Sequence, residues 1–226
     1  MKTKVEERFS EFFEKWMCQL HEYLQHLRRA SEDYRAKTGC EREQELQASV
    51  SKVTQHYKDY YTIKWALAHE DVLAFFCPIW ISPLENAYSW VTGWKPSAVL
   101  KLVNSIRING ILSSSLVELT QEQMRKIEAL RVKISKQEDS GVGKVGGSSE
   151  EWGGSEASGG IGAGGTERSN GRTIEVMKAA DYVRLRTLKG VLDVLSLLQC
   201  VEFLAGIGML QILLRQWGKK TVCTIN

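Results

Sequence analysis

The chain has 226 residues, enough for one sizeable domain, and its 43% hydrophobic and 25% charged content is ordinary for a soluble globular protein. A formal net charge of +3, without a long run of basic residues, argues against a surface built to bind nucleic acid. The five cysteines are widely spaced and contain no C-x-x-C pair, which favours free thiols over a disulfide framework, and the four histidines are too scattered to indicate a metal site.

Apolar residues at helical spacing dominate the N-terminal part of the chain. Their recurrence at steps of three and four predicts a long amphipathic helix over residues 5–29 and a second from about Glu43 to Phe76. Lys64 falls on the apolar face of this second helix. Pro78 and Pro83 then interrupt the pattern, because each lacks an amide donor and disfavours a helical residue before it, so an irregular link is expected between them.

Two tryptophans mark the next stretch. A short helix is expected over Leu84–Val91, ended by a turn at Gly93, and Pro96 suits the first position of the helix that follows. Trp90 and Trp94 flank this turn. The pattern favours packing of both indoles as a wedge between helices over an exposed platform on which a ligand would stack.

Two capping boxes mark helix starts in the C-terminal half. Thr120 with Gln123, and Ser196 with Gln199, fit the S/T-x-x-Q pattern in which two backbone amides at a helix start gain side-chain partners. The segment Val191–Leu214 is long and apolar enough to raise the question of a membrane span. Its polar residues favour a buried helical hairpin instead.

Residues 140–171 differ from the rest of the chain. They hold most of its 19 glycines and few branched apolar side chains, so they predict a flexible linker that cannot offset its ordering entropy. Trp152 is the one large apolar residue there, interpreted as a stray aromatic or a short docking element. The expected fold is all-α: a multi-helix bundle in a single domain, 1–226, with this long glycine-rich flexible insert between the N-terminal helices and the C-terminal helical hairpin.

Motifs of catalysis are missing from the sequence. There is no G-x-S-x-G, and the glycine-rich stretch at residues 141–147 has no strand before it and no G-K-[ST] ending. Without a convergent set of titratable residues, we expect no enzymatic activity. The basic stretch RLRTLK at residues 184–189 is interpreted as a solvated face with snorkelling side chains, not as an element that reads DNA.

Three segments carry a family resemblance: Phe9–Leu27 (FSEFFEKWMCQLHEYLQHL), His56–Tyr61 (HYKDYY) leading into Pro78–Val103, and Ala180–Lys220. They resemble the plant seed-dormancy control domain of the Delay of Germination family, which also follows the leucine zipper in TGA-type bZIP factors. The resemblance covers nearly all of the chain except the glycine-rich insert. It marks a set of signature positions, expected to be structural: Trp16, Tyr57, Pro83, Leu84, Glu85, Trp90, Gly93, Trp94, Pro96, Ser97, Gln199, Trp217 and Gly218.

The resemblance implies a regulator of seed dormancy, maturation or germination, linked to abscisic-acid signalling and transcription and located in the nucleus, the cytoplasm or both. It implies docking onto signalling proteins, with group A protein phosphatases 2C or bZIP factors as partners. The alternative is a sequence-specific DNA-associated transcriptional regulator, acting directly or as a partner of bZIP factors. No basic region and zipper precede Phe9, so the short form of the family is expected, without its own DNA-reading element.

The sequence departs from the family pattern in three places. Dormancy-type members carry histidines associated with haem on the last helix, whereas Gln211 and Arg215 stand at those places here. Neither is a good haem ligand, so no cofactor is expected. Leu197 replaces a proline that relatives show before the last helix, and the glycine-rich insert stands where relatives continue a helical segment.

Overall fold

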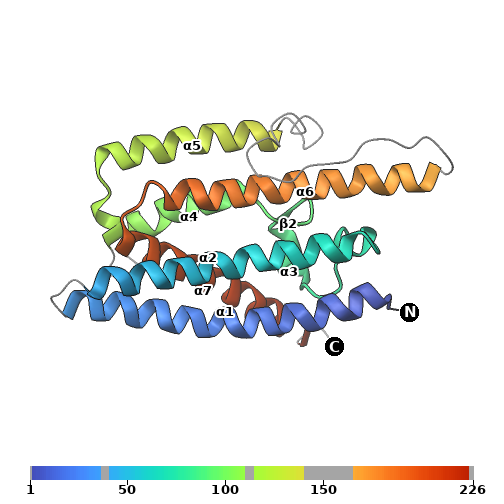
Figure 1. Ribbon diagram of the computed structural model, residues 1–226, viewed down its shortest axis with the longest axis horizontal. Coiled ribbons are helices and arrows are strands. Elements are labelled where there is room, and N and C mark those ends of the chain that lie inside the picture. The colour runs from blue at the N-terminus through green and yellow to red at the C-terminus, as the bar shows by residue number, and fades with distance from the viewer. Residues whose placement is uncertain (1, 37–40, 110–114, 140–164, 224–226) are drawn as a thin grey trace.

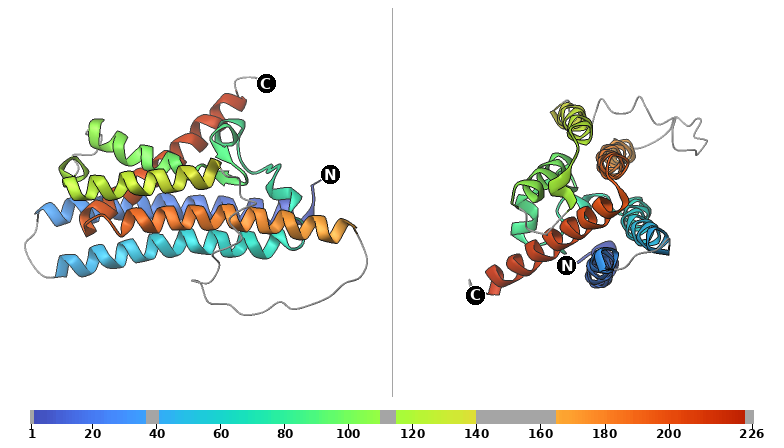
Figure 2. Two further views of the ribbon diagram at one scale, coloured as in Figure 1. Left: turned by 90° about the horizontal axis from the view of Figure 1, so that it is seen from above. Right: turned by 90° about the vertical axis from the view of Figure 1, so that its left-hand side faces the viewer.

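The computed structural model of the chain describes residues 2–36, 41–109, 115–139 and 165–223. Four long helices run along the length of the molecule and a fifth, α7, crosses them obliquely (Figures 1 and 2). These helices are α1 (Lys4–Ala36), α2 (Glu41–Ala68), α5 (Gln121–Asp139), α6 (Gly165–Leu192) and α7 (Leu197–Cys223). The expected all-α bundle is confirmed.

Shorter elements connect α2 to α5 along the chain. They are the 3-10 turns η1 (Leu73–Phe75) and η2 (Ser115–Glu118), the helices α3 (Pro83–Ala87) and α4 (Pro96–Asn109), and a hairpin of two-residue strands, β1 (Ser89–Trp90) and β2 (Gly93–Trp94). Pro96 opens α4 as expected. The face of α4 that carries Val99, Leu100 and Val103 is buried.

Helix α7 is the centre of the core. It packs against α1, α2, α3, α4 and η2, and its Val201, Phe203 and Leu204 are almost wholly buried. In the described part of the chain it is the one helix long and apolar enough to cross a membrane, yet 61% of its most apolar window is buried inside the bundle. That burial accounts for its composition, in agreement with the helical hairpin inferred from the sequence.

Both predicted capping boxes are present. The Thr120 amide donates to Gln123 Oε1 (3.0 Å) and the Gln123 amide to Thr120 Oγ1 (3.2 Å). Ser196 and Gln199 exchange the corresponding bonds at 2.9 and 3.4 Å. Gln199 also donates to the Ser115 carbonyl (3.1 Å), so this cap connects α7 to η2. A side-chain cap contributes about 1 kcal/mol to helix stability.

Two further helices begin in the same way. Thr3 and Glu6 form a capping box at the start of α1, and Ser82 and Glu85 form one at the start of α3. Their S/T-x-x-E pattern is readable in the sequence. Four of the helix starts are therefore encoded by the same short local signal.

The second helix is shorter than expected. It ends at Ala68 and not at Phe76, because Asp71 caps the 3-10 turn that follows: its Oδ1 accepts a hydrogen bond from the Ala74 amide (3.2 Å). Aspartate competes with helix propagation by binding nearby backbone amides. Of the apolar residues at 72–76, which the periodicity assigned to the helix, Val72, Ala74 and Phe75 are buried in the core from η1 and its flank, whereas Leu73 is exposed.

The helix expected over Leu84–Val91 is also shorter than predicted. It ends at Ala87, and the residues after it turn into the β1–β2 hairpin, in which Ser89 pairs with Trp94. The sequence pattern missed this hairpin because two-residue strands carry almost no periodicity. Its turn residue, Val91, has a φ of 58° and no glycine marks that position.

The glycine-rich linker was predicted to end at residue 171, but α6 already begins at Gly165. Helix propagation adds one hydrogen bond for each residue fixed, so a helix anchored downstream extends outward through weak helix formers. Gly171 is part of this extension, with no atom near the position that its Cβ would take. The remainder of the predicted linker, residues 140–164 with Trp152, lies outside the described residues.

Glycines in α7 permit close packing of neighbouring elements. A Cβ on Gly206 would lie 2.7 Å from Ile106 Cδ1 of α4, and one on Gly208 would lie 3.6 Å from Leu20 Cδ1 of α1. The tightest approach is at Gly218, where a Cβ would lie 2.0 Å from Ser82 Oγ and 2.6 Å from Ser82 Cβ. The capping residue of α3 therefore rests directly on the backbone of α7.

Gly218→Ala is expected to destabilise the protein by about 1–3 kcal/mol, because the new methyl overlaps a Cβ that is fixed to the α3 backbone. Gly208→Ala is the matched control: its Cβ makes an ordinary contact, so the gain in helix propensity of roughly 1 kcal/mol leaves stability unchanged or raised. Urea unfolding of both variants measures the two free energies. Equal effects of the two substitutions would contradict the close approach at Gly218.

Candidate functional site

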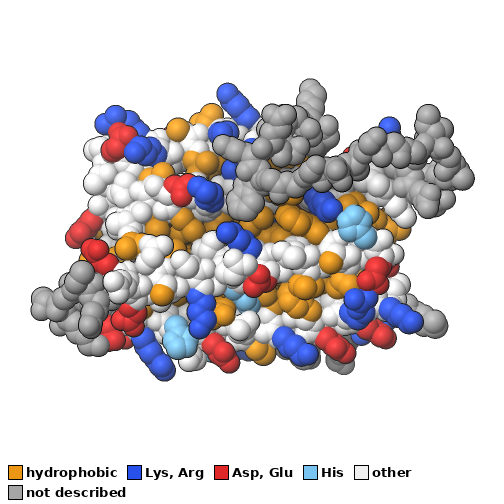
Figure 3. All heavy atoms as spheres, viewed as in Figure 1, with side chains coloured by type: hydrophobic (Ala, Val, Ile, Leu, Met, Phe, Trp, Pro, Cys, Tyr) orange, Lys and Arg blue, Asp and Glu red, His pale blue; other side chains and the backbone are white. Residues whose placement is uncertain are grey.

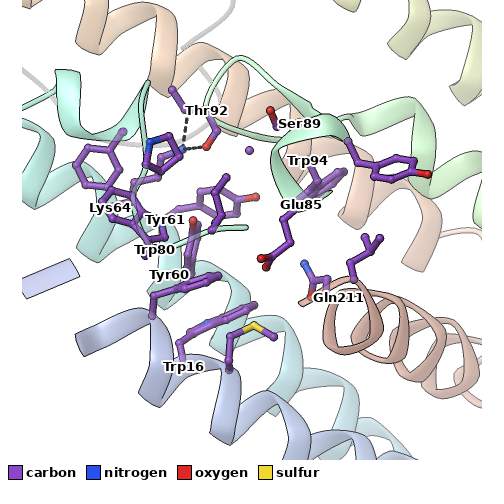
Figure 4. Close-up of a pocket in the computed structure, with 18 of the residues that line it drawn as sticks. Trp16, Tyr60, Tyr61, Lys64, Trp80, Glu85, Ser89, Thr92, Trp94 and Gln211 are labelled. Atoms are coloured by element: carbon purple, nitrogen blue, oxygen red, sulfur yellow. Dashed lines mark hydrogen bonds between the residues drawn. The ribbon is translucent and has the colours of Figure 1, made fainter. Parts of the chain in front are cut away.

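A pocket of about 140 Å³ opens between α1, α2, α7 and the segment that contains α3 and the β1–β2 hairpin (Figure 4). Its walls are mostly aromatic, with Trp16 from α1, Tyr60 and Tyr61 from α2, and Trp80 and Trp94 from the irregular segment. Glu85, Ser89, Thr92 and Gln211 supply polar atoms. The pocket therefore joins residues that are far apart in the chain.

Trp16, which lines the pocket, stacks on the ring of His56, which does not. The Trp16 indole lies parallel to the His56 imidazole, with ring centroids 4.6 Å apart and planes inclined by 5°. Trp16 Nε1 donates to the His56 carbonyl (3.1 Å), and His56 Nε2 lies 3.1 Å from the Trp16 carbonyl. Burial lowers the pKa of His56, which favours the neutral imidazole. These reciprocal bonds fix α1 and α2 at the level of the pocket.

The β1–β2 hairpin forms another wall and is held by its backbone. Arg184, on α6, donates through Nε to the Trp94 carbonyl (2.8 Å) and through Nη2 to the Trp90 carbonyl. A Cβ on Gly93 would lie 3.2 Å from the Arg184 guanidinium, so a glycine lets the arginine approach the strand closely. The positive φ of Val91 costs of order 1–3 kcal/mol, and the arginine clamp is one interaction that offsets it.

Behind the hairpin lies a fully buried charge cluster formed by Lys64, Asp181 and Arg184, whose side chains are 1%, 0% and 0% exposed. Asp181 Oδ1 accepts from Lys64 Nζ (2.9 Å) and Arg184 Nη1 (2.6 Å). Its other oxygen accepts from Trp65 Nε1 (3.0 Å). Removing one partner of such a buried pair typically costs 3–5 kcal/mol, since a charge is then left uncompensated.

Lys64 has a second set of partners in the hairpin turn. Its Nζ donates to the Thr92 carbonyl (3.1 Å) and to Thr92 Oγ1 (2.8 Å). Burial lowers the pKa of Lys64 to about 8; the Asp181 carboxylate opposes that shift and the Arg184 charge adds to it. The cluster as a whole holds two cations and one anion, so it carries one surplus positive charge when Lys64 is protonated.

A second ion cluster closes the opposite side of the pocket. Arg215, on α7, donates to the Trp80 carbonyl (3.0 Å), pairs with Glu14 of α1, and lies 3.4 Å from Glu85 Oε1. Its guanidinium also sits 4.7 Å from the centroid of the Phe13 ring. The position at which a haem-binding relative would carry histidine is therefore occupied here by a residue that ties three elements together.

Gln211, at the other such position, lines the pocket and accepts a hydrogen bond from the Tyr57 hydroxyl through Oε1 (2.9 Å). No group of three or more metal-ligating side chains occurs among the described residues. Cys18, Cys77 and Cys200 are free thiols. The expectation that the chain takes no haem stays a prediction, now with a packing role for both Gln211 and Arg215.

The structure gathers five of the thirteen signature residues around the pocket: Trp16, Tyr57, Glu85, Gly93 and Trp94. Others set its frame. Pro83 opens α3, Leu84 and Gly218 lie where α3 meets α7, and Trp90 offers its carbonyl and its ring to Arg184, whose Cζ lies 5.5 Å from the ring centroid.

The remaining signature residues lie elsewhere. Pro96 and Ser97 begin α4, where the Ser97 amide donates to Glu138 Oε1 of α5 (2.7 Å). Gln199 caps α7 and contacts Gln123 (2.8 Å). Trp217 differs from all of these, because 53% of its surface is exposed.

Sequence reasoning missed the charged residues that organise the site. Arg184 was placed on a solvated face, which is wrong: it is completely buried and bound to Asp181 and two carbonyls. The periodicity placed Lys64 on the apolar face of its helix. That position in the helical repeat already indicated that the side chain is buried. Asp181, three residues before Arg184, could have been recognised as the i,i+3 partner that a buried arginine requires.

The lowered pKa of Lys64 gives a pH-dependent stability. Below about pH 8 the lysine is protonated in both states, and its burial penalty is fully present. Above that pH the folded protein releases the proton, while the unfolded chain retains it until near its ordinary value of 10.5, so stability rises with pH. Between about pH 7.5 and 9.5 the wild type should gain about 2 kcal/mol relative to Lys64→Met.

Urea unfolding at these two pH values measures this difference. Lys101→Met, at an exposed position on α4, is the control and should follow the wild type. The range stops near pH 10, because burial raises the pKa values of Tyr57 and Tyr60 and stability falls where the unfolded tyrosines ionise. Parallel stability curves for the wild type and Lys64→Met would contradict the shifted pKa.

Comparison with known proteins finds similarity in several parts of the chain. A family model described as seed dormancy control matches residues 23–105, from α1 through the pocket-forming segment into α4. Protein RESPONSE TO ABA AND SALT 1 of Arabidopsis thaliana is 29% identical over 60% of this chain and 56% of its own length. The TGACG-sequence-specific DNA-binding protein TGA-2.1 of Nicotiana tabacum is 26% identical over 58% of this chain, which corresponds to 25% of that protein.

Protein DOG1-like 4 of Arabidopsis thaliana is similar along its whole length. It is 42% identical over 237 aligned residues, which cover 97% of this chain and 96% of the relative. The likeness thus includes the helices α5 to α7 that lie beyond the family-model match. On the strength of this agreement, the chain belongs to the seed dormancy control family.

Proposed function

We propose that the chain is a non-enzymatic regulator of seed dormancy, maturation or germination that acts by docking onto signalling proteins. The observation that carries this proposal is an exposed apolar surface beside the pocket, called here the α3–α7 face and formed by Tyr88, Leu210 and Trp217. These side chains are 61%, 39% and 53% exposed. Exposed aromatic residues are the type that dominates the energy of protein interfaces.

The geometry of this face supports docking. Leu210, Leu214 and Trp217 follow one another at steps of four and three on α7, so they lie on one side of that helix. Tyr88 ends α3, which packs on α7 at Gly218, and both Tyr88 and Leu214 line the pocket. Signature residues therefore form the rigid support, and the α3–α7 face is the surface that they present.

Two relatives guide the choice of partners. The name of Protein RESPONSE TO ABA AND SALT 1 connects a similar chain to the response to ABA, and the TGA relatives connect the domain to transcription. We propose group A protein phosphatases 2C, which the family resemblance implies, as the first partner class, and bZIP factors, to which the TGA relatives point, as the second. The nucleus is the proposed place of action, with the cytoplasm as a further site.

Purified chain and purified group A phosphatase 2C should bind each other in a biolayer interferometry assay. Trp217→Ala and Tyr88→Ala are expected to weaken binding about tenfold or more, because exposed aromatic anchors are lost, without a change in melting temperature. Ile108→Ala, on α4 and 65% exposed, is the matched control and should bind as the wild type does. Binding that is unaffected by all three substitutions would exclude the α3–α7 face.

DNA-associated regulation is the second candidate, favoured by the TGA relatives. The charge distribution supports an indirect form of it, through bZIP partners. Lys64 and Arg184 are buried and unavailable to phosphates. On the face shown in Figure 3, Lys and Arg side chains are interspersed with Asp and Glu and form no continuous basic patch.

The purified chain alone is therefore expected to show no preference for promoter fragments over random DNA. Any binding at low salt should be lost steeply as salt rises, since only phosphate contacts remain available. Mobility-shift titrations at two salt concentrations measure both properties. A preference for one fragment that persists at the higher salt would establish direct sequence reading.

A further inference from the structure

The size and walls of the aromatic pocket define the shape of a molecule that would fill it. Its volume of about 140 Å³ is close to that of an engineered protein cavity, roughly 150 Å³, that stays dry and binds benzene. The walls include the aromatic side chains of Trp16, Tyr60, Trp80 and Trp94. A space of this size between aromatic rings suits one planar ring or a small fused pair.

Glu85 gives this apolar space an acceptor. Its Oε2 accepts from the Ser82 amide (2.7 Å) in the capping box, and its Oε1 has a long contact of 3.4 Å with Arg215 Nη1. An ionised carboxylate offers about four acceptor positions, so acceptor capacity remains although the side chain is only 13% exposed. Figure 4 shows this carboxylate pointing into the space between Tyr60 and Gln211.

Gln211 supplies a donor on the other side of the space. Because its Oε1 is taken by the Tyr57 hydroxyl, the amide nitrogen is the end that can donate to a ligand. The neighbouring cations have acceptors of their own: Lys64 Nζ donates to Thr92 and Asp181. Arg215, which does not line the pocket, donates through Nη1 and Nη2 to the Trp80 carbonyl, Glu85 and Glu14, and its buried Nε has no acceptor among the described residues. The pocket thus offers an anionic acceptor and an amide donor, an arrangement that disfavours carboxylate ligands.

We infer that this pocket binds a small, neutral, planar aromatic compound that donates an N–H or O–H group to Glu85. The ring stacks among Trp16, Tyr60 and Trp94, and an acceptor atom on the ring system, where present, receives the Gln211 amide. Indoles and phenols have this chemistry. Such a ligand would contact the hairpin wall and the rim of the pocket next to Tyr88. Binding of the ligand would therefore affect residues that border the α3–α7 face.

Isothermal titration of the full chain with indole and with phenol tests the inference. One equivalent should bind with a Kd of roughly 0.1–1 mM, as expected for ligands of so few atoms. The probes 1-methylindole and anisole keep the ring but lose the donor. They should bind about tenfold more weakly, because the buried carboxylate then faces an apolar methyl group. Benzoate should not bind.

Two substitutions assign the polar contacts. Glu85→Gln preserves the capping box, in which glutamine also serves, and should weaken indole binding several-fold by removing the charge on the acceptor. Gln211→Met keeps the side-chain volume and removes the amide, and it should weaken probes that carry an acceptor atom, phenol among them. Glu128→Gln, at an exposed position on α5, is the control and should leave both affinities unchanged.

Nuclear magnetic resonance of the unaltered protein keeps the inference testable if a variant unfolds. Indole addition should shift the indole N–H signals of Trp16, Trp80 and Trp94, and leave that of Trp217 in place. Equal affinity for the methylated and unmethylated probes would overturn the donor assignment. Absence of saturable binding, or shifts confined to Trp217, would overturn the site itself.

Discussion

Asp181 is enclosed without solvent between Lys64, Arg184 and the Trp65 indole, and this carboxylate determines how α2, α6 and the hairpin meet. Each cation that it binds also reaches into the hairpin: Lys64 to Thr92 and Arg184 to the carbonyls of Trp90 and Trp94. A buried charge without these partners would be strongly unfavourable, so only one relative placement of the three elements satisfies all of the groups. The pocket wall exists because of that constraint.

The pocket is bounded on its other sides by interactions of a different kind. The ring nitrogens of Trp16 and His56 each contact the other residue's carbonyl across α1 and α2, while Arg215 connects α7 to Glu14 and the Trp80 carbonyl. Packing of Ser82 on Gly218 sets the distance between α3 and α7. Signature positions recur at these junctions, which explains why a family of regulators can be recognised from residues that mainly support a surface.

Much of the fold could be predicted from local signals. The capping boxes at Thr120 and Ser196 located two helix starts, Pro96 located a third, and the stripe of α1 was readable from its spacing. Such signals act within a few residues, so a single sequence contains them completely. The boundary error at Phe76 arose because the Asp71 cap competes with an apolar pattern that continues past it.

The hairpin and the charge cluster could not be predicted in the same way. The backbone of Val91 adopts its unfavourable φ because Arg184, more than ninety positions further along the chain, binds the carbonyls on both sides of the turn. Burial of Arg184 and Lys64 likewise depends on Asp181, which lies on a different element from Lys64. Long-range interactions of this kind produce no periodic pattern in the sequence. The local sequence around a basic residue among leucines is the same whether the side chain faces water or a buried carboxylate.

Arg184 holds the hairpin through main-chain oxygens, which every amino acid possesses. Its hydrogen bonds therefore do not depend on the side chains at positions 90 and 94, although the Trp90 ring adds a cation–π contact, whereas no other residue type can replace the three-way contact at position 184. Positions 90 and 94 can therefore tolerate more substitutions than position 184, although all three take part in one interaction. Related chains can consequently change the lining of this wall, and with it what the pocket accommodates, while the fold that carries the wall stays the same.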